Sequence, residues 1–146
     1  MGKAVLAREN VVAGCVANSF EDAIKDCGDM LVKAGYVNEK YIEGMLKREE
    51  EFSTAIGNSL AIPHAVMDYK KEIIETGLVI RAYPDGIDWN GESVKLVIGI
   101  AAKGDEHLEI LEKIANTFEE PETAGELAAK NDPGLIYDLL TMEGSF

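Results

Sequence analysis

Two apolar segments dominate the middle of the chain, Gly77-Leu-Val-Ile-Arg-Ala-Tyr83 and Val94-Lys-Leu-Val-Ile-Gly-Ile-Ala-Ala102. Both are rich in aliphatic and β-branched side chains, which is typical of β-strands. The intervening Pro84-Asp85-Gly86 has turn-favoured residues in turn-favoured order, so we predict that a turn there joins the two strands. A shorter apolar run, Leu60-Ala61-Ile62, stops at Pro63 and predicts another strand.

Helices are expected on both sides of these strands. Ser19 is suited to cap a first helix, with Asp22 in its first turn, and apolar residues then recur at helical spacing until Gly35 ends it. A second helix should run from Asn38 to about Glu49 or Glu51. Residues 52–59 read as a loop, because they are polar and include a glycine.

A third helix should follow the loop Lys103-Gly104-Asp105, with an apolar stripe that includes Ile110 and Ile114. Pro121 and Pro133 each suit the first turn of a short C-terminal helix. Residues 10–17 read as a short strand or a loop. This order predicts an α/β fold: a single domain, residues 1–146, with a mixed β-sheet flanked by helices on both faces.

The composition narrows the classes of partner. The formal net charge is −13, whereas binding to nucleic acid or to an anionic membrane surface needs basic residues. The N-terminal Met1-Gly2-Lys3-Ala4 lacks the apolar run of a signal peptide, and no segment is long and apolar enough to span a bilayer. We therefore expect a soluble, cytoplasmic protein that binds no nucleic acid and does not insert into membranes.

Several familiar motifs are missing from the chain. It has no GxxxxGK[ST] or GxGxxG phosphate loop, no HExxH, no Cys and His at zinc spacing, and no GxSxG elbow. Its two cysteines form no CxxC pair, and Cys27 is expected to be a buried free thiol. We therefore expect no cofactor and no metal, and attention turns to the two histidines and three arginines.

His64 follows the stiff Ile62-Pro63 step. Because proline lacks an N–H and favours an extended preceding residue, His64 is expected at a strand end, where it is well placed and partly open. The alternative is a histidine that only caps the strand end, and the local pattern alone favours that alternative.

His107 lies near the start of the third helix and shares a face with Ile110 and Leu111, so it should point inward. The helix N-terminus disfavours an imidazolium and offers free N–H groups to an anion. The alternative is an interfacial histidine hydrogen-bonded to Asp105 or to water.

Arg48 and Asn58 are the remaining candidates. Arg48, in the last turns of the second helix, can grip a phosphoryl group with two parallel hydrogen bonds, but it can equally be a solvated partner of nearby glutamates. The amide of Asn58 can bind a phosphate oxygen, orient His64, or simply support a turn.

Taken together, four ordered segments resemble the mannitol/fructose-type IIA components of the bacterial phosphotransferase system. They are Gly35-Tyr-Val37 with Tyr41-Ile-Glu-Gly-Met-Leu-Lys-Arg-Glu49, Gly57-Asn-Ser-Leu-Ala-Ile-Pro-His64, Leu96-Val-Ile-Gly-Ile-Ala-Ala102, and Glu106-His-Leu-Glu-Ile-Leu111. The similarity extends from about Ser19 to Leu140. The segments Tyr83–Trp89 and Gly104–His107 look most like the mannitol-specific branch.

This resemblance implies that His64 accepts a phosphoryl group from phosphohistidine on the carrier HPr and passes it to a cysteine of the IIB domain of a mannitol-type permease. It implies that Arg48 and His107 assist the transfer and that Asn58 lies beside the site. By the same analogy, Nε2 of His64 carries the phosphoryl group. Neutral imidazole is a competent acceptor near pH 7, so the chemistry suits the residue.

Three alternatives stay open at this point. The chain would use the same His64 chemistry as a regulatory phosphocarrier of the nitrogen-related type, with binding to a target protein as its output. It would also fit a fructose-specific IIA component. Finally, both histidines would be structural if the chain were an interaction module without phosphoryl chemistry.

Overall fold

A computed structural model describes residues 4–142 and residue 146. Its centre is a five-stranded sheet with the order β1-β4-β5-β3-β2. The strands are β1 (Val11–Val12), β2 (Ala55–Gly57), β3 (Leu60–Ala61), β4 (Gly77–Trp89) and β5 (Glu92–Ala101). Strands β4 and β5 pair antiparallel, as do β2 and β3, whereas β1 on β4 and β3 on β5 are parallel. The sheet is therefore mixed, as the sequence predicted.

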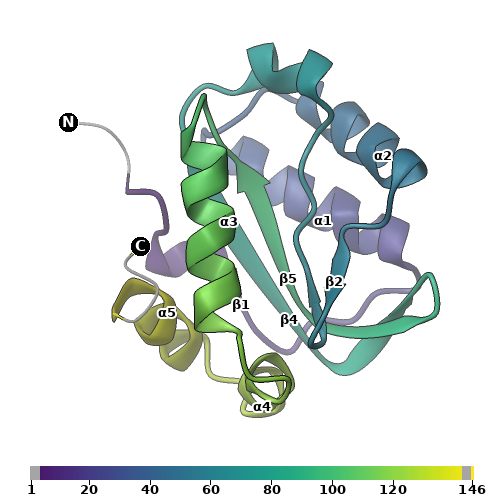
Figure 1. The fold of residues 1–146 in the computed structure, drawn as a ribbon, viewed down its shortest axis with the longest axis vertical. Helices are drawn as coiled ribbons and strands as arrows, with labels where there is room; N and C mark the ends of the chain where they lie inside the picture. Colours follow the sequence, from purple (N-terminus) through teal and green to yellow (C-terminus); the bar gives the residue numbers. More distant parts are fainter. Residues whose placement is uncertain (1–3, 143–145) are drawn as a thin grey trace.

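Helices cover both faces of this sheet (Figure 1). They are α1 (Phe20–Lys33), α2 (Tyr41–Glu51), α3 (Glu106–Thr117), α4 (Thr123–Ala129) and α5 (Pro133–Met142). Alternate residues of β4 separate two cores: Leu78 and Ile80 pack with α3, α4 and α5, whereas Val79 and Tyr83 pack with α1 and α2. Strands β4 and β5 are thus buried on both sides, which explains why they read as nearly continuous apolar runs.

The turn predicted at Pro84-Asp85-Gly86 is wrong. Strand β4 continues through these residues to Trp89, and the pairing with β5 shifts register between Ala82 and Ile87. The hairpin turn is Asn90-Gly91, whose φ values are 53° and 93°. Positive φ values at both residues of a two-residue loop are typical of a type I′ turn, whose twist matches the twist of the flanking strands. The earlier segment is a bulge in which Gly86, at φ 80°, takes up the irregular backbone.

The loop predicted for residues 52–59 is wrong in part, because Ala55–Gly57 forms β2 and pairs with β3. The connection is a two-residue turn in which Asn58 and Ser59 both have positive φ, 56° and 62°. This small hairpin lies at the edge of the sheet, and its second strand leads directly toward His64. Residues 10–17 include one short strand, β1.

The helix boundaries largely follow the predicted signals. The Ser19 hydroxyl accepts a hydrogen bond from the Asp22 N–H at 3.2 Å, and Gly35 after α1 has a φ of 84°. Helix α2 begins at Tyr41 rather than Asn38, because residues 38–40 form a turn whose carbonyl groups accept bonds from N–H groups three residues later. Pro133 begins α5, whereas Pro121 lies two residues before α4.

Two short 3-10 helices complete the fold, η1 (Arg8–Asn10) and η2 (Met67–Glu72). Cys27 is fully buried as a free thiol, as predicted, and burial raises its pKa to about 12. Within residues 4–142, no helix is long and apolar enough to cross a membrane. Residues 1–3, which belong to the N-terminal segment considered for a signal peptide, lie outside the described residues.

Candidate functional site

His64 lies just beyond the end of β3, after Pro63, and its side chain is half-buried. Its Nδ1 is 2.8 Å from the backbone carbonyl oxygen of Ile62. A carbonyl group only accepts hydrogen bonds, so the ring proton sits on Nδ1. The neutral ring therefore has its lone pair on Nε2, which makes Nε2 the nucleophilic atom.

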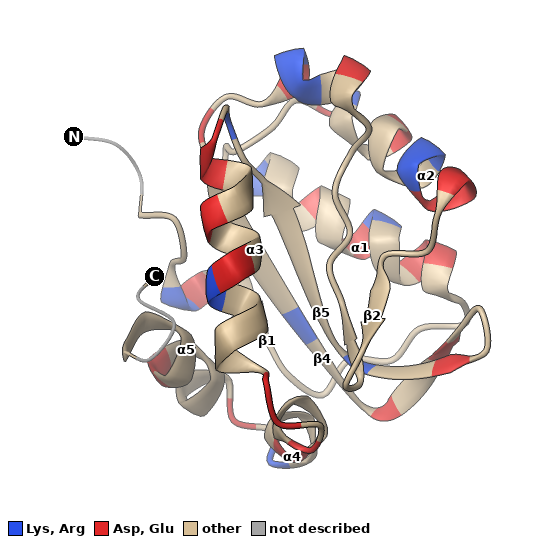
Figure 2. Ribbon diagram, viewed as in Figure 1, with Lys and Arg blue, Asp and Glu red and all other residues tan. Residues whose placement is uncertain are grey.

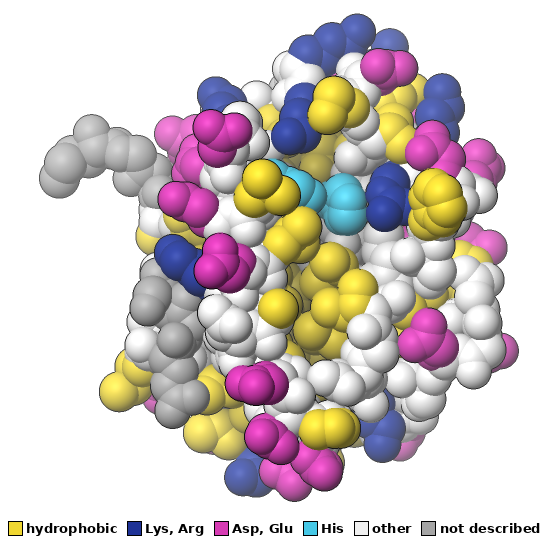
Figure 3. Space-filling view, viewed as in Figure 1, with side chains coloured by type: hydrophobic (Ala, Val, Ile, Leu, Met, Phe, Trp, Pro, Cys, Tyr) yellow, Lys and Arg dark blue, Asp and Glu magenta, His cyan; other side chains and the backbone are white. Residues whose placement is uncertain are grey.

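The parallel pairing of β3 and β5 brings His107 to His64. Because the two strands run in the same direction, with Ala61 opposite Val97, their C-terminal ends point to the same edge of the sheet. From that edge, β5 leads through a short loop into α3. His107 is in the first turn of α3, and the centroids of the two imidazole rings are 4.9 Å apart. Figure 3 shows the two rings side by side on the surface. One small group can therefore contact both rings.

The start of α3 is fixed by Thr76, which precedes β4. Its hydroxyl donates to the Glu106 carboxylate at 3.0 Å and accepts from the Lys103 N–H at 3.0 Å. His107 follows Glu106 directly, so these bonds hold it over the sheet edge. The inward direction predicted for His107 agrees with its contact with His64.

Arg48 comes to the same place from the last turn of α2. Its Nη1 donates to the Phe52 carbonyl oxygen at 2.8 Å, and its guanidinium carbon lies 5.8 Å from the centroid of the Phe52 ring. Both histidines and Arg48 line a cavity of about 270 Å³. The other residues around this cavity are Tyr41, Glu51, Ala65, Val66, Met67, Lys70, Ile73 and Ala102.

Asn58 does not line this cavity, so its predicted place beside the site is not what the structure shows. It occupies the turn at one end of β3, whereas His64 follows the other end. Its amide donates to the Phe118 carbonyl oxygen at 3.0 Å. This bond joins the β2–β3 turn to the end of α3, which is a supporting role.

Lys70 is a charged cavity residue that the sequence analysis did not single out. It belongs to η2, which packs against α2 at Gly44, where an added Cβ would lie 2.5 Å from Cγ of Tyr69 and 2.9 Å from Cβ of Ala65. The signal was Gly44 itself, since a glycine inside a helix often marks a close approach of another segment. The cavity thus holds two cationic side chains, Arg48 and Lys70, beside two imidazoles.

The end of α2 is anchored by a buried carboxylate, Glu49. It accepts hydrogen bonds from the Trp89 indole N–H at 2.9 Å, the Thr54 N–H at 2.9 Å and the Thr54 hydroxyl at 2.6 Å. These bonds connect the helix to the tip of the β4–β5 hairpin and to the segment before β2. Because Glu49 adjoins Arg48, the anchor fixes the backbone that presents the guanidinium.

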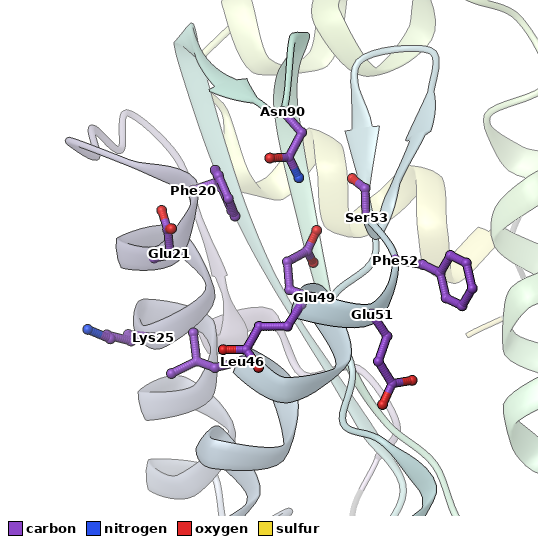
Figure 4. A pocket seen from close by; sticks show the side chains of 10 residues that line it. Phe20, Glu21, Lys25, Leu46, Glu49, Glu51, Phe52, Ser53 and Asn90 are labelled. Atoms are coloured by element: carbon purple, nitrogen blue, oxygen red, sulfur yellow. The ribbon is translucent and has the colours of Figure 1, made fainter.

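A larger cavity, of about 600 Å³, lies on the other side of this anchor and contains neither histidine. Figure 4 shows the lining side chains that come from α1 (Phe20, Glu21 and Lys25) and those that come from α2, among them Leu46 and Glu49. Four of this cavity's ten lining residues are glutamates. Among the described residues, no group of three or more His, Cys, Asp or Glu side chains is placed to hold a metal ion. The smaller cavity is the one that contains both histidines and Arg48.

Both imidazoles have a lowered pKa. For His64, burial is the largest cause, the Ile62 carbonyl opposes it, and the positive charge of Arg48 adds to the lowering. Burial lowers the pKa of His107 to about 4, with further lowering from the charges of His64 and Lys70. Both rings are therefore neutral near pH 7, as predicted for His107, although burial is the main cause rather than the helix N-terminus.

Residues 4–142 match the family described as the phosphoenolpyruvate-dependent sugar phosphotransferase system, EIIA 2. The chain belongs to this family. This agrees with the resemblance found in the sequence, and the IIA fold accounts for the mixed sheet with helices on both faces. The match covers every strand and every helix described above.

Several proteins similar to this IIA chain have mannitol in their names. The mannitol-specific phosphotransferase enzyme IIA component of Halalkalibacterium halodurans is 44% identical over 87% of this chain and 88% of its own length. The crystal structure of IIA mannitol from Escherichia coli superposes with a TM-score of 0.85 at 35% identity, covering 92% of this chain and 97% of that one. A structure of the Escherichia coli IIA mannitol enzyme in complex with phosphorylated IIB superposes with a TM-score of 0.86 at 34% sequence identity. That match covers 92% of this chain and 96% of the other.

The lowered pKa values predict how this IIA chain titrates. We expect NMR titration midpoints below 6.5 for both histidines and near 4 for His107. Unfolded histidine titrates near 6.5, so between about pH 6.5 and 4 the unfolded chain binds more protons than the folded one. The free energy of unfolding should therefore fall as the pH is lowered through this window.

The His107→Gln variant isolates one part of this effect. It cannot take up the proton, so its unfolding free energy should fall less between pH 7 and pH 4 than that of the wild type. Urea unfolding at both pH values measures the difference. A His107 midpoint above 6.5, or equal losses in the two proteins, would contradict the expectation.

Proposed function

We propose that this chain is a cytoplasmic, mannitol-specific IIA phosphocarrier. In this proposal Nε2 of His64 accepts a phosphoryl group from phosphohistidine on HPr and later yields it to a cysteine of the IIB domain of a mannitol-type permease. The observation that carries the proposal is the hydrogen bond from Nδ1 of His64 to the Ile62 carbonyl oxygen. It leaves Nε2 as the basic nitrogen in a cavity that also contains Arg48, Lys70 and His107.

The proposed transfer is a pair of displacements at phosphorus. The Nε2 lone pair of His64 forms a bond to phosphorus while the bond to the HPr nitrogen breaks and its electron pair returns to that imidazole. In the second step, a IIB cysteine thiolate attacks the same phosphorus and Nε2 of His64 leaves with its electron pair. The protein mainly positions the group and stabilises the charge on its oxygens.

The cavity residues suit this division of labour. The Arg48 guanidinium has five N–H donors, and one nitrogen already binds the Phe52 carbonyl, so the others are available to phosphoryl oxygens. The Lys70 ammonium adds a second positive charge. His107, 4.9 Å from His64 between ring centroids, can donate an N–H to a phosphoryl oxygen.

Exposed apolar side chains near the cavity support a protein as donor and acceptor. Phe52 is 73% exposed and contacts Arg48, Met67 is 77% exposed and lines the cavity, and Leu108, beside His107, is 69% exposed. Figure 3 shows hydrophobic side chains close to both histidines. In Figure 2, α2 and η2 carry both basic and acidic residues. Large apolar side chains exposed beside a reactive group are typical of a protein interaction site.

The choice of mannitol rests on the names of relatives up to 44% identical to this chain. The test is to phosphorylate the purified chain with phosphoenolpyruvate, enzyme I and HPr, then to offer separate mannitol-type and fructose-type IIB domains. We expect one acid-labile phosphoryl group per chain and rapid transfer to the mannitol-type IIB. Faster transfer to the fructose-type domain would assign the chain to fructose, and transfer to neither would favour a regulatory phosphocarrier.

Lys70 and its neighbour Lys71 provide a matched pair of variants. Lys70 lines the cavity and is partly buried, whereas Lys71 is exposed and outside it. We expect Lys70→Met to slow phosphoryl transfer from HPr by about tenfold or more, because a charge that stabilises the transferring group is lost. Lys71→Met should leave the rate within about twofold, since an exposed charge away from the site is screened by salt.

Rapid-quench measurement of the rate at saturating HPr checks this prediction. The same loss in both variants would indicate that the lysines act through the general charge of the surface. An unchanged rate in Lys70→Met would remove Lys70 from the site.

A further inference from the structure

Both peptide groups that flank His64 are tied to one residue of β5, Ile100. On one side, the Ile100 N–H donates to the Pro63 carbonyl oxygen at 2.9 Å. On the other side, the Ala65 N–H donates to the Tyr41 hydroxyl at 3.2 Å, and that hydroxyl donates to the Ile100 carbonyl oxygen at 2.7 Å. The Tyr41 hydroxyl is thus the bridge that closes this clamp.

The clamp matters because the chain around His64 has no regular pairing of its own. Strand β3 ends at Ala61 and η2 begins only at Met67. Between them, the Ile62 N–H bonds to the Thr54 carbonyl and the Val66 N–H bonds to the Gly44 carbonyl. The Tyr41 bridge supplies the missing anchor at the peptide that directly follows the histidine.

Tyr41 is well suited to this task. It is the first residue of α2, its exposed fraction is 2%, and burial raises its pKa to about 12, so the hydroxyl keeps its proton. That single hydrogen is already donated to Ile100. It is therefore not available to a phosphoryl oxygen, and Tyr41 acts through the backbone of His64.

We propose that Tyr41 is a positioning residue for phosphoryl transfer: its hydroxyl fixes the Ala65 peptide on β5 and so holds the His64 ring with Nδ1–H on Ile62 and Nε2 facing the cavity. The inference deepens the proposed function and rests on it. Reacting groups must be held within about 0.5 Å of the productive geometry, and a displacement of about 1 Å can cost about a hundredfold in rate. A loosened Ala65 peptide permits such a displacement.

Tyr36 offers a matched control. Its exposed fraction is also 2%, and its hydroxyl also donates to a backbone carbonyl at 2.7 Å, that of Ala4. It lines a different cavity, which contains neither histidine. Tyr41→Phe and Tyr36→Phe therefore each remove one buried hydroxyl, but only the first removes a bond next to His64.

Two measurements separate a positioning role from a loss of stability. In single-turnover transfer from phospho-HPr, Tyr41→Phe should be slowed about tenfold to a hundredfold at saturating HPr, with the half-saturating HPr concentration unchanged. Nitrogen NMR of the unphosphorylated protein should show the Nδ1–H form of His64 in the wild type and a mixture of both neutral forms in Tyr41→Phe. Tyr36→Phe should match the wild type in both measurements.

The outcomes distinguish this inference from the proposed function. A normal rate and a normal imidazole form in Tyr41→Phe, or equal slowing in both variants, would overturn the positioning role and leave the phosphocarrier intact. If the wild-type chain accepts no phosphoryl group, the proposed function fails, yet the NMR comparison still tests the clamp. Hydrogen exchange of the Ala65 amide in the wild type is independent of any variant: strong protection is expected, and exchange at the rate of unstructured chain would overturn the clamp.

Discussion

Replacement of His64 by glutamine is expected to abolish phosphorylation of the chain by phospho-HPr. Glutamine can still donate an amide hydrogen toward the Ile62 carbonyl, but it has no basic nitrogen to attack phosphorus. The wild type should gain one phosphoryl group per chain, measured by intact-protein mass before and after mild acid. The variant should show no gain at any enzyme concentration.

The His107→Gln variant is the control for this experiment, because it removes the second imidazole of the same cavity. If His107 only assists, His107→Gln should still reach one phosphoryl group per chain, at a reduced rate. If His64→Gln were phosphorylated and His107→Gln were not, the acceptor would be His107 rather than His64. The wild-type product should be Nε2-phosphohistidine, since Nδ1 of His64 is bound to the Ile62 carbonyl.

The central strands could be predicted because a strand buried on both faces has a nearly continuous run of apolar residues. Residues of β4 such as Leu78 and Val79 face opposite cores, so neither face required polar residues. The hairpin turn was misplaced because bulges and turns favour the same residues. Gly86 in the bulge and Gly91 in the turn both have positive φ, and only the strand register distinguishes the two roles.

Strand β2 was missed for a related reason. Its three residues, Ala55–Gly57, are too few to show an alternating pattern, and they become a strand only by pairing with β3. The turn after β2 uses Asn58 and Ser59, both with positive φ, where glycine or asparagine is usual. That turn directs the Asn58 amide to the end of α3, which no local pattern in the sequence indicates.

The site could be assembled from the sequence only through the family resemblance. His64, His107 and Arg48 lie on three separate elements, and the parallel pairing of β3 with β5 is what joins two of them. This pairing is a long-range contact that the residues around either histidine do not predict. Lys70 could not be predicted from the sequence because its approach to the cavity depends on the contact between η2 and Gly44 of α2.

Replacement of Arg48 by alanine is expected to slow phosphoryl transfer by about a hundredfold to a thousandfold, because a fixed donor to the charged oxygens of the transferring group is lost. Arg48→Lys should recover only part of the rate. An ammonium is a point charge and cannot bind the Phe52 carbonyl and two phosphoryl oxygens with the geometry of a guanidinium. Single-turnover transfer in both directions, from HPr and to IIB, measures the effect.

Lys47→Ala is the matched control, because Lys47 precedes Arg48 on α2 and its ammonium lies over the Tyr69 ring, 5.3 Å from the centroid, outside the cavity. Its rate should stay within about twofold of the wild type, since an exposed charge outside the site is screened. If Lys47→Ala and Arg48→Ala slow transfer equally, the helix contributes only a general positive field for docking. If Arg48→Ala transfers at the wild-type rate, the stabilising charge must come from Lys70 alone, and the Arg48 bond to Phe52 would be purely structural.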